Sequence, residues 1–152
     1  MFPSVPDDRL TRRIVFLGKE LREYFQAALV DHGATIPTWA VLSHAHHAPG
    51  LSQVQLAGRI GIEGPTLARH LDRLCAEGLV ERRRDTQDRR VVRIELTEEG
   101  ERRWAELKDV ADRMEQHLTR YLDDDQATAL AATLDAVHRA LEDANVPALA
   151  NR

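Results

Sequence analysis

The sequence has a single cysteine, Cys75, so no disulfide can form within one chain. It also lacks an apolar run long enough to cross a membrane, and its first residues have no apolar stretch of the kind found in signal peptides. A chain with these features is expected in a reducing compartment. We therefore expect a cytoplasmic protein.

The chain likewise lacks the local patterns that carry most enzyme chemistry. It has no Gly-x-Ser-x-Gly turn for a nucleophilic serine, no glycine-rich loop for phosphates, and no cysteine–histidine pair at a useful spacing. With 152 residues, of which 43% are hydrophobic, it can still build one domain with a real core. The sequence therefore predicts a compact protein that is not an enzyme and needs no cofactor.

Charge is present but unevenly placed. The net charge is −4, yet residues 82–93 contain six arginines against two aspartates, a local balance of +4. Exposed charges farther apart than the Debye length of ~8 Å are largely screened, so the local field matters more than the net charge. An arginine cluster in an acidic chain indicates a polyanionic partner, and nucleic acid in particular.

Hydrophobic periodicity predicts six helices and one hairpin, which makes the fold class mainly α with a small β-hairpin (α+β). Ser52 and Gln55 form a capping-box pattern at the start of one helix, and the spacing of apolar residues changes from about 3.6 to 2 after Gly78. The predicted helices cover approximately residues 9–31, 37–48, 52–60, 63–78, 97–121 and 123–146, and the hairpin lies between residues 79 and 96.

The helix predicted at residues 63–78 has two different faces. Its leucines form one stripe, and a polar stripe with Thr66, Arg69, His70 and Arg73 lies apart from it. A buried side and a cationic side suit a helix that reads the major groove of DNA. The following hairpin presents arginines at its tip, where an extended arginine can enter a narrow minor groove.

Residues 37–100 resemble the MarR family of winged-helix bacterial regulators. Within that family they are most similar to the SlyA branch. The segments that carry the resemblance are Trp39–Leu42, Ser52–Ala57, Gly61–Leu67, Leu71–Leu74, Glu77–Val80, Asp88–Arg90 and Leu96–Gly100. The resemblance implies a homodimer that binds an inverted repeat in double-stranded DNA, with half-sites ~10 bp apart. It also implies dimerisation helices at residues 1–34 and 99–146, a winged helix-turn-helix domain at residues 35–98, and a tail at residues 147–152.

Within this framework the hairpin is the wing and residues 63–78 form the recognition helix. Thr66 and Arg69 are expected to read base edges, Arg82–Arg84 to meet phosphates, and Asp88 to orient a neighbouring guanidinium. The predicted DNA-binding residues are Ser52, Gln53, Pro65, Thr66, Arg69, His70, Arg73, Arg82, Arg84, Asp88, Arg89 and Arg90. Glu63 departs from the serine or threonine that many members carry at the start of the recognition helix, and its carboxylate would repel a nearby phosphate.

The family resemblance further implies an effector pocket beside the winged helix. Its lining residues would be Lys19, Arg22, Trp39, Ser43 and His70, and cations beside an aromatic ring suggest a small anionic aromatic ligand. A metal-responsive regulator that uses His44, His46 and His47 is an alternative, although a helix brings two of these histidines together at best, so we predict no metal site. A further alternative is an interaction module whose basic wing binds an acidic protein.

Overall fold

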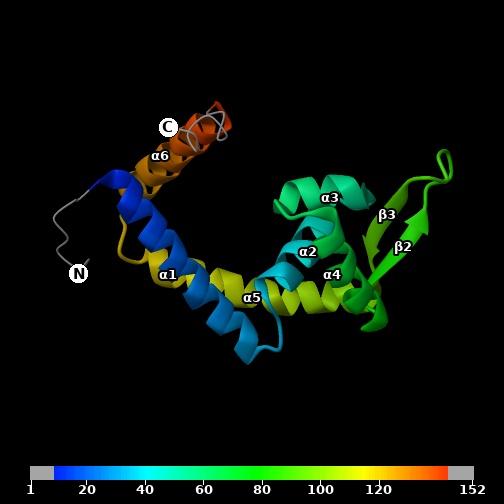
Figure 1. Ribbon diagram of the computed structural model, residues 1–152. Coiled ribbons are helices and arrows are strands. Elements are labelled where there is room, and N and C mark those ends of the chain that lie inside the picture. The colour runs from blue at the N-terminus through cyan, green and yellow to red at the C-terminus, as the bar shows by residue number, and fades with distance from the viewer. Residues whose placement is uncertain (1–8, 144–152) are drawn as a thin grey trace. The chain divides into compact units, whose positions relative to one another are not determined.

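The structure, a computed structural model, describes residues 9–143, which form six helices and a three-stranded sheet. The elements are α1 (Leu10–Asp31), α2 (Ile36–His47), β1 (Leu51–Ser52), α3 (Gln53–Ile60), α4 (Gly64–Ala76), β2 (Val80–Arg84), β3 (Val92–Leu96), α5 (Glu98–Thr119) and α6 (Asp124–Asp143). The mainly helical fold class with a small hairpin is confirmed (Figure 1). No helix within the described range is both long and apolar enough to span a bilayer.

The described residues form two compact units, one that ends at Ala111 and one that begins at Asp112. The first unit contains the sheet and α1 to α4, together with the start of α5. The division into a central domain with dimerisation helices on both sides stays a prediction. The tail predicted at residues 147–152 lies outside the described residues.

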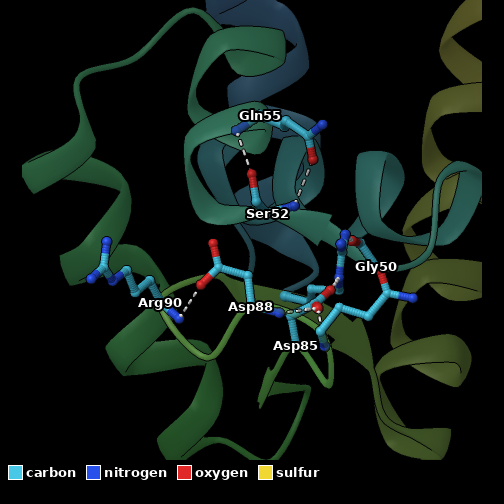
Figure 2. Close-up of polar contacts among 8 residues, drawn as sticks. Gly50, Ser52, Gln55, Asp85, Asp88 and Arg90 are labelled. Carbon is cyan, nitrogen blue, oxygen red and sulfur yellow. Dashed lines mark hydrogen bonds and ion pairs between the residues drawn. The ribbon is translucent and has the colours of Figure 1, made fainter.

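Local chemistry fixes where α3 begins and ends. Ser52 Oγ accepts a hydrogen bond from the backbone N–H of Gln55 at 3.2 Å, and Gln55 Oε1 accepts one from the backbone N–H of Ser52 at 2.9 Å (Figure 2). This is the predicted capping box, which satisfies two of the donors that a helix start leaves open. Gly61 ends the helix with a φ of 74°, a left-handed conformation that glycine adopts without a steric cost.

The core of the first unit forms where α4 packs against α2, α3 and the sheet. Leu67, Leu71 and Leu74 recur at helical spacing on α4, and none of them is exposed. Ile94 of β3 is equally buried. Burial of each such side chain stabilises the fold by about 1.5–3 kcal/mol, so this contact fixes α4 on the rest of the unit. The fully buried larger side chains are Leu29, Val41, Leu42, Leu56, Leu67, Leu71, Leu74, Ile94 and Leu107.

The sheet has the order β1–β3–β2 and is antiparallel throughout. β2 and β3 form the predicted hairpin, with Val80 opposite Leu96 and Arg84 opposite Val92. The hairpin projects beyond helices α2 to α4 in Figure 1. β1 was not predicted from the sequence, because two residues show no alternation and its partner in β3 lies more than forty residues along the chain.

The start of α5 packs tightly on the base of the hairpin. Thr97 Oγ1 accepts a hydrogen bond from the backbone N–H of Gly100 at 3.0 Å and donates one to the carbonyl of Gly78 at 2.6 Å. Thr97 therefore caps α5 and joins it to the end of the α4–β2 connection. Gly100 is buried, and a Cβ atom there would lie 2.0 Å from the carbonyl oxygen of Leu79.

We predict that Gly100→Ala lowers the free energy of unfolding by about 3 kcal/mol, because the added methyl group forces the Leu79 backbone to move. Gly58→Ala is the matched control, since Gly58 lies inside α3 and a Cβ atom there meets nothing within 4 Å. It should raise the free energy of unfolding by about 0.5–1 kcal/mol. Urea denaturation measures both, and equal effects of the two substitutions would contradict the close contact.

Candidate nucleic-acid interface

The exposed face of α4 carries part of the predicted polar stripe. Arg69 is exposed, and among residues 9–143 its guanidinium has no hydrogen-bond or ion-pair partner. Thr66 is half-buried and Pro65 is exposed in the first turn. Glu63 occupies the N-cap position but makes no side-chain capping bond. The start of α4 therefore offers a free cation beside small side chains.

The stripe is not uniformly available, however. Arg73 donates a hydrogen bond from Nη2 to Oγ1 of the buried Thr38 of α2 at 2.9 Å, and its Nε lies 3.6 Å from Glu77 Oε1. Arg73 thus connects α4 to α2 rather than standing free. Burial, followed by the charges of Arg73 and Arg69, lowers the pKa of His70 below its usual value, so the neutral imidazole is favoured beside the two arginines.

Arg82 of β2 was predicted to meet DNA phosphates, which stays a prediction, and in the structure it has partners within the protein. Its Nη1 donates to Asp72 Oδ1 at 2.6 Å, and its Nη2 donates to the carbonyl oxygen of Ala68 at 3.3 Å. Both acceptors belong to α4, so Arg82 holds α4 against the first strand of the hairpin. Sequence spacing could not indicate this contact, because the partners lie on different elements.

Two further arginines of the hairpin are also held by carboxylates. Arg83 lies 2.5 Å from Glu81 Oε1 and 3.3 Å from Glu95 Oε2, so its ion pairs stay within β2 and β3. Arg93 pairs with Asp85 and donates from Nη1 to the carbonyl oxygen of Gly50 at 2.7 Å. Arg93 therefore ties the loop between β2 and β3 to the segment before β1.

Asp85 organises that loop. Its Oδ1 accepts hydrogen bonds from the backbone N–H groups of Gln87 at 2.7 Å and Asp88 at 2.9 Å, and its Oδ2 pairs with Arg93 (Figure 2). The bonds from the Asp88 N–H, Arg93 and the Gln87 N–H lower the pKa of Asp85 to about 2. The carboxylate is therefore charged at neutral pH and largely shielded, with 12% of its side chain exposed.

Asp88 acts differently from the expectation that it orients a guanidinium. Its Oδ1 accepts a hydrogen bond from the backbone N–H of Arg90 at 3.0 Å, which fixes the turn and leaves the Arg90 side chain free. In Figure 2 that side chain extends away from Asp85 and Gly50. An aspartate two residues before an N–H commonly makes this local bond, and it competes with a bond to a guanidinium.

A hollow of about 480 Å³ brings together several of the predicted contact residues. Ser52, Gln53 and Arg90 line it with the more apolar Val54, Gly64, Val91 and Val92. It lies between the start of α3, the start of α4 and the start of β3, at the loop end of the hairpin. Val54 is 83% exposed, and sequence reasoning did not single it out, because one valine at a helix start carries no distinctive pattern.

The residues predicted to line an effector pocket are not linked to one another. Trp39 packs edge-on against Phe25 with ring centroids 6.0 Å apart, and Lys19 lies 3.7 Å from Glu23. Arg22 is exposed and Ser43 is half-buried. Within residues 9–143, no hydrogen bond, ion pair or ring contact joins any two of Lys19, Arg22, Trp39, Ser43 and His70.

The histidines of α2 have separate hydrogen-bond partners. His44 Nδ1 lies 2.8 Å from the Ala40 carbonyl and His47 Nδ1 lies 2.7 Å from the Ser43 carbonyl, one turn back on the same helix. His46 stacks on Trp104 of α5, with ring centroids 3.4 Å apart, and its Nδ1 lies 2.6 Å from Glu101 Oε2. In the part of the chain that the structure describes, no group of three or more His, Cys, Asp or Glu side chains is arranged to hold a metal.

The low pKa of Asp85 has a consequence for stability. A carboxyl group whose pKa falls from 3.8 to about 2 on folding stabilises the fold above pH 3.8 and loses that effect as pH falls through about 2. Asp85→Asn keeps the acceptor oxygen but removes the charge. The wild type should therefore be more stable than the variant near pH 7, with a difference that shrinks below about pH 4. Guanidinium unfolding at several pH values measures it, and a difference independent of pH would contradict the role of the charge.

Comparison with known proteins agrees with this arrangement. Residues 34–92 match the model of the MarR family. The structure of CouR, a transcriptional repressor bound to a 23-mer DNA duplex, has a TM-score of 0.79 and 29% identity, over 86% of this chain and 93% of that one. A mutant of MarR from E. coli complexed with operator DNA has a TM-score of 0.76 and 26% identity, over 84% and 92% of the two chains. A MarR transcriptional regulator from Methanosarcina mazei Go1 has a TM-score of 0.75 and 26% identity, over 86% and 94%. The chain thus has the fold of MarR-type winged-helix proteins, and its residues 34–92 match the MarR family.

Proposed function

We propose that this protein is a sequence-specific DNA-binding transcriptional regulator of the MarR type. The observation that carries the proposal is the distribution of unpartnered cations. Within residues 9–143, Arg69 on α4 and Arg84, Arg89 and Arg90 on the wing, which is the β2–β3 hairpin with its loop, have no carboxylate partner. These are the two elements that a winged helix brings to the grooves of a duplex.

The ion pairs within the protein indicate that the arginine-rich surface of the wing and α4 binds a partner and does not serve only to keep the protein in solution. Arg82, Arg83 and Arg93 are held by carboxylates and hold the hairpin and α4 in a fixed arrangement. The remaining arginines extend from that fixed frame. A frame set before binding lowers the entropy cost of ordering side chains on the DNA.

The relatives supply the class of partner. CouR and the MarR mutant are each seen with DNA, and the present chain covers more than nine-tenths of either chain. The MarR match covers α2 to the start of β3, which includes α4 and the wing loop. We extend DNA binding from those proteins to this one on the combination of the shared fold and the free arginines.

We further propose that the protein acts as a homodimer on an inverted repeat. Both α1 and α6 expose large apolar side chains, such as Leu10 at 64%, Val15 at 69% and Leu141 at 60%. Exposed apolar stripes of this size on a soluble protein mark an interaction surface. A second copy of the chain supplies two wings, and the two-fold symmetry of a dimer requires a matching symmetry in its operator.

We also propose that a small anionic aromatic ligand regulates the protein, and that the protein is most similar to the SlyA branch. Trp39 offers a half-buried ring beside α1, and Arg22 offers an exposed cation on that helix. Thermal shifts with salicylate and with zinc would separate an aromatic effector from a metal, because a ligand at ~100 times its dissociation constant adds ~2.7 kcal/mol to stability.

Selection from random duplexes tests the main proposal. The purified protein should enrich an inverted repeat and bind it about 10³-fold or more tightly than a scrambled duplex at physiological salt. Light scattering of the free protein should give the mass of a dimer. Equal binding to every duplex would overturn the proposal and favour a wing that binds an acidic protein.

Arg69 should contribute to base discrimination. Arg69→Ala is expected to cost about 1–3 kcal/mol on the selected duplex and to relax the preference at one base pair of each half-site. Arg73→Ala removes the same charge from the same helix, but Arg73 is held by Thr38 and Glu77, so its base preferences should stay unchanged. Binding measured on single-substitution duplexes distinguishes the two variants. Unaltered preferences in a folded Arg69→Ala protein would exclude Arg69 as a base contact.

A further inference from the structure

The wing loop contains a second hollow, separate from the one beside α3. It has a volume of about 380 Å³ and is lined by Arg84, Asp85, Thr86 and Arg89. Arg84 ends β2, and Arg89 lies in the loop on the other side of the turn. Two cations from opposite sides of the loop thus converge on one concave surface.

The two arginines are available for a ligand. Neither guanidinium has a hydrogen-bond or ion-pair partner among residues 9–143, and both side chains are exposed. Asp85 is the one acidic residue of the lining, and its carboxylate is already engaged by two backbone N–H groups and by Arg93. The Asp85 charge is therefore offset by Arg93, and Arg84 and Arg89 keep their charges uncompensated.

The position of Arg84 on β2 shows which side of the wing the hollow lies on. Alternate residues of a strand share a face, so Arg84 lies on the same face of β2 as Arg82. Arg82 contacts Asp72 and Ala68 of α4, which shows that this face is turned toward the recognition helix. Arg84 follows Arg82 by two residues, about 6.6 Å farther toward the tip of the wing. It is therefore on the side of the wing that faces the proposed DNA site, beyond the reach of Asp72.

The chemistry of the hollow fits a phosphodiester group. Two guanidinium groups and the Thr86 hydroxyl supply donors around one space, and a phosphate presents oxygen acceptors in several directions with a single negative charge. A base edge offers acceptors for one bidentate arginine, so it would leave the second cation unused. We propose that Arg84 and Arg89 together hold one backbone phosphate of the bound DNA. This inference rests on the proposed DNA-binding function.

The assignment separates two neighbouring arginines that the sequence presents as a pair. Arg90 lines the hollow beside Ser52, Gln53 and the start of α4, whereas Arg89 lines the hollow at the wing loop with Arg84. Arg89 is thus a phosphate contact that sets the position of the wing on the duplex. Arg90 is left as the unpaired wing arginine that shares a hollow with the start of α4.

The test uses the full chain and the duplex that it selects. Each backbone phosphate of one half-site is replaced in turn by a neutral methylphosphonate, and the dissociation constant is measured. For the wild type, one replacement facing the wing should weaken binding on the order of tenfold. In the double variant Arg84→Ala/Arg89→Ala, that same replacement should have no effect, while replacements elsewhere keep theirs.

Salt dependence provides a second readout. If both arginines hold one phosphate, the losses of DNA affinity in Arg84→Ala and Arg89→Ala should not be additive. The double variant should reduce the slope of log K against log salt by ~0.9 per wing. Arg83→Ala is the matched control on the same strand, because its guanidinium is held by Glu81 and Glu95. It should leave the slope and the methylphosphonate pattern unchanged.

The outcomes are distinguishable. Additive losses, or a methylphosphonate pattern unchanged in the double variant, would overturn the shared phosphate while DNA binding stands. Inorganic phosphate that binds the wild type but not the double variant, and that leaves DNA affinity unchanged at constant ionic strength, would assign the hollow to a free anion and overturn the proposal as stated. A wild-type protein that prefers no duplex would overturn the proposed function and this inference with it.

Discussion

Six like charges within twelve residues repel one another, and the shape of the wing depends on how that repulsion is relieved. Arg93 is paired with Asp85 in the loop, Arg82 with Asp72 on α4, and Arg83 with glutamates on both strands of the hairpin. Each of these exposed or partly exposed pairs contributes little by itself, typically 0–1 kcal/mol. Their importance lies in the segments that they join, because the proposed contact of the hairpin and α4 with one duplex needs a fixed relation between these segments.

The apolar core also holds the hairpin and α4 in position relative to each other. The buried leucines of α4 hold it against α2, α3 and Ile94 of β3, and the tight contact of Gly100 with Leu79 fixes the start of α5 at the base of the hairpin. Packing therefore holds α4 and the hairpin together, and the ion pairs add contacts between them and across the wing. The free arginines are the charges left over after both requirements are met.

The elements of this fold could largely be predicted, because the signals that define them are local. Ser52 with Gln55, Thr97 before α5 and the change of period after Gly78 each act within a few residues of where they are read. β1 was not predicted, because a two-residue strand is defined only by its pairing with another strand, here β3. The division of the arginines was missed for the same reason, as Arg82 and Asp72 are ten residues apart and meet only after α4 has packed. The helical periodicity showed that Arg69 and Arg73 share a face of α4. It could not show that Arg73 donates a hydrogen bond to Thr38 of α2.

The stacking of His46 on Trp104 makes part of this molecule observable in solution. The chain has two tryptophans, and one of them lies flat against an imidazole at the contact between α2 and α5. Indole fluorescence responds to a partner at van der Waals distance, and Trp39, which packs against Phe25 instead, supplies an internal reference. Separation of α2 from α5 would therefore change the emission of one tryptophan and not the other. The protein carries its own optical reporter of the contact between α2 and α5, and no dye has to be attached to read it.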